Sequence, residues 1–256
     1  MIHQTAIIDS QAELASGVEV GPYSIIGPQV KIGRNTKIGP HVVIDGWTHI
    51  GEGCTVFQFA SIGALPQDLK YKGEESWVIM GNNNTIREFV TINRGTSWSQ
   101  GKTTIGNNNF FMAYSHVAHD CKIGNHVILA NAATLAGHIT IEDCAIVGGL
   151  VGVHQFVRLG CHSIIGGGSG VNKDVPPYMM ANGQRAKLYG LNTTGLQRHH
   201  FSEEALTNLK KAYRIIFRSG LTIEKASDQL THEVKNSPEV KHLIRFIESS
   251  ERGITR

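Results

Sequence analysis

An aliphatic side chain returns at every sixth residue through the first part of the chain. The residue two places before it is often small or β-branched, and the residue after it is often Gly or Asp. A period of six matches neither the 3.6-residue turn of a helix nor the simple alternation of a strand. It suits a short strand and a corner, with both recurring side chains pointing inward. The aliphatic positions are Ile2, Ile8, Leu14, Val20, Ile26, Ile32, Ile38, Ile44, Ile50, Val56 and Ile62.

Three such sides close a triangular coil of about eighteen residues. Successive coils stack at the strand spacing of about 4.8 Å, so each buries its inner face only against its neighbours. The sequence therefore predicts a mainly β protein built as a parallel β-helix. The repeat resumes at Met80, Ile86, Ile92 and Trp98, slips by one residue, and then continues from Ile105 to Val171.

Two segments leave the period, at about residues 64–79 and 97–104. We expect both to project from the coils as loops, where solenoid proteins commonly carry function. From about Gly195 the period is lost, and Ser202, Thr222 and Ser237 read as the N-caps of three helices. The predicted organisation is a β-helix over residues 1–190 and a C-terminal helical domain over 191–256.

Composition narrows the function classes. The chain has 256 residues, of which 41% are hydrophobic and 18% charged, and a net charge of +3 does not point to nucleic-acid binding. No apolar run approaches the roughly 20 residues that cross a bilayer. The first ten residues lack a signal peptide pattern, and the four cysteines show no C-x-x-C spacing. We expect a cytoplasmic protein with reduced thiols and no zinc ribbon.

Histidines gather at one predicted corner. Asp120 lies eighteen residues before His138, so the two should lie one above the other in adjacent coils, with His119 beside them and His154 about one coil further on. Imidazole titrates near neutral pH and can take a proton from a hydroxyl. This cluster is our candidate for acid–base chemistry.

Two other interpretations stay open at this point. His116, His119 and His138 could supply three nitrogens to Zn²⁺, with water in the fourth position, as in catalytic zinc enzymes. The same histidines could also be exposed polar residues of a non-catalytic β-helix scaffold. The zinc interpretation leaves the long loop and the helical tail without a role, and the scaffold interpretation explains the repeat alone.

Seven motifs follow one another in a fixed order along the chain. They are QDLKYKGE (67–74), AHDC (118–121), LAGH (135–138), VHQF (153–156), GGGSGV (166–171), DVPPY (174–178) and GLNTTGLQR (190–198). On these motifs the chain resembles the UDP-N-acetylglucosamine 3-O-acyltransferases of the hexapeptide acyltransferases, which begin lipid A synthesis, and this resemblance implies a left-handed β-helix. A related N-acyltransferase family carries an extra domain before its repeats, whereas the repeats start at Ile2 here.

The resemblance implies transfer of a 3-hydroxyacyl group from acyl carrier protein to the sugar 3-hydroxyl. We predict His119 as the general base, because a hydroxyl that attacks a thioester must lose its proton. Asp120 would orient His119, the Gly137 N–H would stabilise the tetrahedral oxyanion, and His138 would position the sugar. No acyl-enzyme, metal or resident cofactor is expected, because 4′-phosphopantetheine arrives on the carrier protein.

The resemblance also assigns substrate contacts. Asp68 and Lys70 match residues that hold the glucosamine, while His116, His154 and Gln155 match further substrate contacts. Asn192 and Arg198 match positions that bind uridine and diphosphate. The chain departs from the family pattern at Thr194 and His199, which puts the contacts there in doubt.

Gly167 matches a position that gauges acyl-chain length, and its missing side chain predicts a long acyl group. The resemblance further implies a homotrimer with active sites between neighbouring prisms. On the first tail helix, Lys210, Lys211, Arg214 and Arg218 recur at helical spacing and form a candidate docking stripe for the acidic carrier protein. The residues leave open the acyl-chain length and whether the acceptor carries a 3-hydroxyl or a 3-amine.

Overall fold

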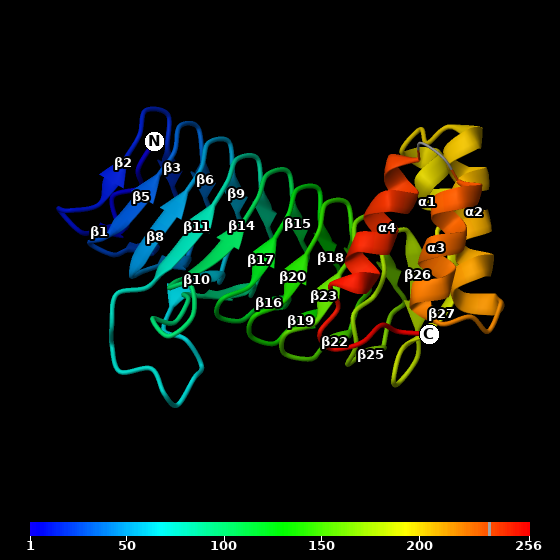
Figure 1. Ribbon diagram of the computed structural model, residues 1–256. Coiled ribbons are helices and arrows are strands. Elements are labelled where there is room, and N and C mark those ends of the chain that lie inside the picture. Colours follow the sequence, from blue (N-terminus) through cyan, green and yellow to red (C-terminus); the bar gives the residue numbers. More distant parts are fainter. Residues whose placement is uncertain (235–236) are drawn as a thin grey trace.

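The computed structural model describes residues 1–234 and 237–256 as a prism of stacked coils followed by a helical region. The coils run from the N-terminus at one end of the prism to the helices at the other (Figure 1). Three sheets form the sides of the prism, and nearly all their strands pair in parallel. This arrangement is the predicted parallel β-helix.

Each sheet collects one short strand from every coil. The first sheet contains β1 (Ile7–Ile8), β4 (Ile25–Ile26), β7 (Val43–Ile44), β10 (Ser61–Ala64), β13 (Thr91–Asn93), β16 (His116–Val117), β19 (Thr134–Leu135), β22 (Gly152–Val153) and β25 (Gly170–Val171). The second contains β2 (Glu13–Leu14), β5 (Val30–Ile32), β8 (Trp47–Ile50), β11 (Trp77–Met80), β14 (Lys102–Ile105), β17 (Lys122–Ile123), β20 (Thr140–Ile141) and β23 (Arg158–Leu159). The third contains β3 (Glu19–Val20), β6 (Lys37–Ile38), β9 (Thr55–Val56), β12 (Thr85–Ile86), β15 (Phe110–Phe111), β18 (Ile128–Leu129), β21 (Ile146–Val147), β24 (Ile164–Ile165), β26 (Met179–Asn182) and β27 (Lys187–Leu191).

The strand register confirms the eighteen-residue coil. Ile8 pairs with Ile26, and Val117 pairs with Leu135. The recurring aliphatic residues point inward and are buried from Val20 onward, and the small residues two places before them are buried as well. Each coil covers only the next one, so the core is a continuous column of mainly aliphatic side chains. Among the described residues, Phe111 is the largest side chain that is fully buried.

Two loops interrupt the coils near the segments that leave the period. The first, residues 65–76, joins β10 to β11 and is shorter than the expected segment, and the second, residues 94–101, joins β13 to β14 and begins three residues earlier than expected. Trp98 continues the count of six but does not point into the core: it is 49% exposed and lies in the second loop. Thr103 and Ile105 fill the interior instead, because the register of β14 is set by pairing with β11 and not by the count of intervening residues.

Corners between strands repeatedly adopt the left-handed backbone conformation, and not only at glycine. Because equivalent corners stack, their side chains form columns. The clearest column is a ladder of stacked rings with centroids about 5 Å apart, which we call the aromatic edge. It consists of Tyr23, His41, Phe59, Phe89 and Tyr114.

In the part of the chain that the structure describes, four helices follow the antiparallel hairpin β26–β27: α1 (Thr193–Arg198), α2 (Glu203–Arg218), α3 (Ile223–Glu233) and α4 (Pro238–Glu248). The predicted N-caps are confirmed, since the hydroxyls of Ser202, Thr222 and Ser237 each accept a backbone N–H of the first helical turn. Among the described residues, none of the helices combines the length and apolar character needed to span a membrane.

Candidate active site

The corner between β16 and β17 brings His119, Asp120 and His138 together, as the coil arithmetic predicted. The His119 and His138 rings meet edge to face with centroids 5.0 Å apart. His138 Nε2 lies 3.8 Å from Asp120 Oδ2. The corner adjoins an open groove and is not sealed inside the prism.

The His119–Asp120 pair depends on the backbone of that corner. Neighbouring residues of a strand point to opposite faces, which would separate the two side chains. Asp120 instead has a φ of 60°, in the left-handed region, and its carboxylate Oδ2 turns to within 2.9 Å of His119 Nδ1. The predicted pairing is therefore present, and corner geometry is what permits it.

The second loop holds the Asp120 carboxylate in place, and β14 accepts the Asp120 backbone N–H. Thr96 donates its backbone N–H to Oδ1 at 3.1 Å and its hydroxyl to Oδ2 at 2.6 Å, and the Asp120 N–H donates to Thr103 Oγ1 at 2.9 Å. Burial raises the pKa of Asp120, but the hydrogen bonds from His119 and Thr96 outweigh it and hold that pKa below its ordinary value. Asp120 is thus ionised at neutral pH.

An ionised carboxylate can only accept hydrogen bonds. His119 Nδ1 must therefore carry the ring N–H, which donates a hydrogen bond to Asp120 Oδ2. His119 Nε2 is then the free, basic nitrogen. The two side chains are only 5% and 1% exposed, which shields this interaction from water. A fixed tautomer with a free Nε2 beside a groove is the arrangement that a general base requires.

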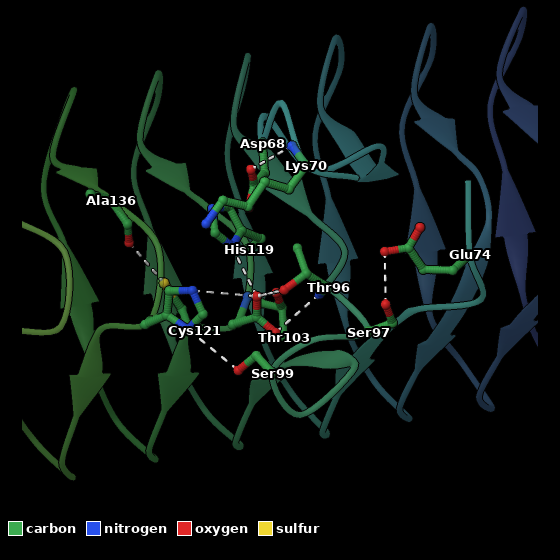
Figure 2. Close-up of polar contacts among 12 residues, drawn as sticks. Asp68, Lys70, Glu74, Thr96, Ser97, Ser99, Thr103, His119, Cys121 and Ala136 are labelled. Atoms are coloured by element: carbon green, nitrogen blue, oxygen red, sulfur yellow. Dashed lines mark hydrogen bonds and ion pairs between the residues drawn. The ribbon is translucent and has the colours of Figure 1, made fainter. Parts of the chain in front are cut away.

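The second loop also encloses the two histidines, a role that the sequence did not reveal. The Trp98 ring lies 5.0 Å from the His138 ring and 6.4 Å from the His119 ring. Ser99 Oγ lies 3.4 Å from His138 Nδ1. Figure 2 shows Asp68 and Lys70 of the first loop, and Thr96 and Ser99 of the second, around His119. Lys70 Nζ is 5.4 Å from the centre of the Trp98 ring.

His138 occupies the corner one coil above Asp120, with a φ of 61°. Its ring stacks on Phe156, the next corner residue, at a centroid distance of 4.5 Å. Burial lowers the pKa of His138, and the charges of Asp120 and Asp68 only partly oppose this. The imidazole is therefore mainly neutral at pH 7 and available for hydrogen bonding to a substrate.

Gly137 lies directly against His119. A Cβ added to this glycine would come within 2.6 Å of the His119 ring, so no other residue fits without moving the imidazole. Across residues 1–234 and 237–256 we find no acceptor for the Gly137 N–H. This N–H is thus available to a ligand beside His119, as the predicted oxyanion role requires.

A groove of about 690 Å³ runs along the first sheet past this corner. His116, His154 and Gln155 line it together with His119 and Gly137, so these five predicted residues share one cavity. The His116 Nδ1 is 2.7 Å from Thr91 Oγ1 on the neighbouring strand. Burial, followed by the charge of His119, lowers the pKa of His116.

Further groove residues were missed by sequence reasoning. Gly152 and Gly170 replace outward side chains on β22 and β25 and so deepen the groove floor. The sequence does carry a pattern that could have identified them: two glycines eighteen residues apart, at an outward position of the strand. Gln184 and Arg185, from the turn between β26 and β27, close one end and carried no such signal.

Besides Asp68 and Lys70 of the first loop, three predicted substrate residues do not line the groove of their own chain. Gly167 is exposed at another corner, where a Cβ would sit 3.3 Å from Gly149 O. Asn192 is buried as the N-cap of α1, where its side chain accepts the Gly195 N–H. Arg198 is exposed at the end of α1. Their substrate roles stay predictions.

The three-histidine zinc arrangement is not what the corner presents. The groups that could ligate a metal there are His119, Asp120 and His138, whose ligand atoms lie within 4.8 Å of one another. His116 is not among them, and its Nδ1 faces Thr91. The geometry fits an orienting carboxylate with two imidazoles better than a trio of nitrogen ligands.

The fold and the site define a hexapeptide-repeat transferase. Residues 102–137 match a sequence model described as bacterial transferase hexapeptide (six repeats), and residues 174–255 match one described as UDP-N-acetylglucosamine O-acyltransferase, domain 2. The chain belongs to the UDP-N-acetylglucosamine O-acyltransferase family and is an enzyme of that class.

Full-length relatives support this assignment. The chain is 57% identical to the acyl-[acyl-carrier-protein]–UDP-N-acetylglucosamine O-acyltransferase of Thermodesulfovibrio yellowstonii, and 55% identical to that of Syntrophobacter fumaroxidans. Each alignment covers 100% of this chain and 99% of the relative. The structure of LpxA from Acinetobacter baumannii superposes with a TM-score of 0.97 at 50% identity, covering 100% of this chain and 99% of that one. The predicted left-handed parallel β-helix with a C-terminal helical region is confirmed.

Proposed function

We propose that this enzyme moves a 3-hydroxyacyl chain from acyl carrier protein to the 3-hydroxyl of the glucosamine in UDP-N-acetylglucosamine, the first step of lipid A synthesis. The observation that carries the mechanism is the His119–Asp120 pair, which leaves His119 Nε2 free at the edge of the groove. The names of the relatives, which include acyl carrier protein and UDP-N-acetylglucosamine, support the choice of donor and acceptor.

The reaction needs no acyl-enzyme. His119 Nε2 takes the proton of the sugar hydroxyl as its oxygen attacks the thioester carbonyl, and Asp120 stabilises the imidazolium that forms. The Gly137 N–H faces the oxyanion of the tetrahedral intermediate, where such a donor contributes about 3 kcal/mol in other enzymes. Collapse of the intermediate breaks the C–S bond, and the departing thiolate receives the proton from His119.

The two loops hold the sugar in this proposal. Asp68 and Lys70 project from the first loop toward the His119 corner, and His138 offers a neutral imidazole there. His154 and Gln155 line the groove beyond Gly137 and would contact the nucleotide or the acyl arm. Asn192 and Arg198 would contribute to nucleotide binding from a second copy of the chain.

We further propose a cytoplasmic homotrimer with a site between neighbouring prisms. The aromatic edge supports this, because its members Tyr23, Phe59, Phe89 and Tyr114 are each at least 43% exposed. A continuous row of exposed rings marks a surface that a partner covers. A second copy on the first sheet would close the open side of the groove and bring its own α1 toward the substrate.

The carrier-protein stripe is smaller than the sequence suggested. Lys211 pairs with Glu233 at 2.7 Å, and the Arg218 side chain donates to Tyr213 Oη at 2.9 Å. Lys210 and Arg214 are exposed on α2 and are the better candidates to meet an acidic partner. Arg214→Glu should raise the apparent KM for the protein donor and leave kcat unchanged; an unchanged KM would remove this surface from the proposal.

A direct transfer assay tests the function. Purified enzyme is given UDP-N-acetylglucosamine or its 3-amino analogue with a series of acyl carrier protein thioesters, and the product is identified by mass spectrometry. His119→Ala should fold normally and lose about 10² to 10⁴ in kcat, whereas His126→Ala, an exposed corner histidine elsewhere, should not. Product from the His119 variant at the wild-type rate would refute the general-base role, and no product with any donor would refute the proposed activity.

A further inference from the structure

A second cluster of ligand-type side chains lies at the corner between the second and third sheets. Cys144 follows β20, and His162 occupies the same corner one coil further on. Both have left-handed backbone conformations, with φ of 60° and 54°. Their side chains therefore project in the same direction, one above the other. This corner is not the one that carries His119.

A third ligand reaches this corner from the helical region. His199 is the C-cap of α1, and its ring meets the His162 ring at a centroid distance of 4.7 Å and an angle of 76°. One ligand atom each of Cys144, His162 and His199 lies within 4.8 Å of the other two. Zinc bonds of about 2.0–2.3 Å place tetrahedral ligand atoms roughly 3.3–3.8 Å apart, so atoms at the 4.8 Å limit must draw closer together on binding. His199 is the exposed member of the set.

His162 has a ring nitrogen without a protein partner. Its Nδ1 is buried, and none of the described residues forms a hydrogen bond with it. The Phe201 ring shelters it at a centroid distance of 5.0 Å. A buried imidazole nitrogen without a partner is costly unless a ligand satisfies it.

Cys144 supplies the soft ligand. Cys144 is a half-buried free thiol, and an ordinary cysteine thiol is mostly protonated at neutral pH. Binding of Zn²⁺ forms the Zn–S bond and releases that proton to solvent, while the two imidazoles bind without losing a proton. A thiolate with two imidazoles favours zinc over magnesium or calcium.

We propose that Cys144, His162 and His199 bind one Zn²⁺, with water in the fourth position, and that this ion fastens the end of α1 to the prism. No sequence motif marks this set, because the ligands come from two coils and the end of a helix and include only one cysteine. The site lies apart from the catalytic groove, so its occupancy is measured independently of acyl transfer.

Metal titration of the whole enzyme tests the proposal. After chelation and dialysis, Zn²⁺ should bind with one ion per chain, release one proton and raise the melting temperature, while Mg²⁺ should do none of these. Co²⁺ should give a tetrahedral spectrum with a near-ultraviolet sulfur-to-cobalt band. Cys144→Ser should abolish that band, and His162→Gln or His199→Gln should weaken Zn²⁺ binding at least about tenfold.

Two variants serve as matched controls. His126→Gln removes the exposed histidine one coil before Cys144 in the same column, and Cys161→Ser removes the neighbouring half-buried thiol. Both should keep the cobalt band and the wild-type zinc affinity. The proposal is overturned if Cys144→Ser binds Zn²⁺ as tightly as wild type, or if wild-type protein gives no sulfur-to-cobalt band.

Discussion

Asp120→Asn tests whether the carboxylate controls the His119 tautomer. In the wild-type protein three donors converge on the two carboxylate oxygens: the Thr96 N–H at 3.1 Å, the Thr96 hydroxyl at 2.6 Å and His119 Nδ1 at 2.9 Å. An asparagine has one acceptor oxygen and one NH₂ group. Whichever way the amide turns, its NH₂ faces a group that now donates.

The two amide orientations set the size of the effect. If NH₂ replaces Oδ2, the His119 Nδ1 must accept, so the ring proton moves to Nε2 and the base is lost. If NH₂ replaces Oδ1, it meets the Thr96 N–H at a cost of about 1–3 kcal/mol, which leaves roughly one molecule in ten to one in a hundred in the active form. Loss of the charge beside the imidazolium removes about another factor of ten.

We therefore expect kcat to fall by about 10² to 10³, somewhat less than the tautomer effect of about 10⁴ in a serine protease triad. KM for the sugar should change little, because Asp120 is 5% exposed and does not line the groove. Steady-state transfer of a 3-hydroxyacyl chain from acyl carrier protein measures both. Asp9→Asn is the matched control, since that carboxylate also accepts a backbone N–H, from Gln11 at 2.9 Å, far from the groove. A kcat within about threefold of wild type would show that the reasoning is wrong.

Three further predictions follow from single positions. Gly137→Ala places a Cβ within 2.6 Å of the His119 ring, so kcat should fall at least about tenfold while thermal stability changes little; equal kcat would mean that the imidazole moves without consequence. Gly167→Met has room apart from Gly149 O at 3.3 Å, and it should shift the preferred donor to a shorter acyl chain; the same preference in a thioester series would end the gauge hypothesis. In metal-free protein the lowered pKa of His162 means that the unfolded chain binds a proton between pH 6.5 and about 4 while the folded chain does not. The free energy of unfolding should accordingly fall as the pH is lowered through that window. In urea unfolding His162→Gln should make this fall smaller, and an equal fall in the variant would show that His162 is not its cause.

The repeat made most of the fold predictable, because strand pairing fixes what the period means. An inward aliphatic residue every six positions determines how the coils stack, although not their handedness, so Asp120 and His138 could be placed together without a structure. The chemistry of their corner was less accessible. Nothing in the sequence marks Asp120, a non-glycine residue, as left-handed, and strand alternation alone argues against its contact with His119.

The loops show where periodic reasoning ends. Trp98 is apolar and falls six residues after Ile92, so counting by six would place it in the core. Its ring instead lies against His138. The hydrogen bonds of Thr96 to Asp120 arise from a loop path that no repeat encodes. Asn192 and Arg198 lie outside the groove of their own chain, so their predicted contacts with the nucleotide depend on the proposed homotrimer.

The left-handed corners have a consequence for how such enzymes diversify. Asp120, His138 and Cys144 share one backbone shape with residues such as Tyr23 and Asn35 that take no part in either site. The strain of that shape belongs to the architecture and was not introduced for the chemistry. A new activity can therefore arise by exchanging side chains at existing corners, while every main-chain hydrogen bond of the scaffold stays as it was.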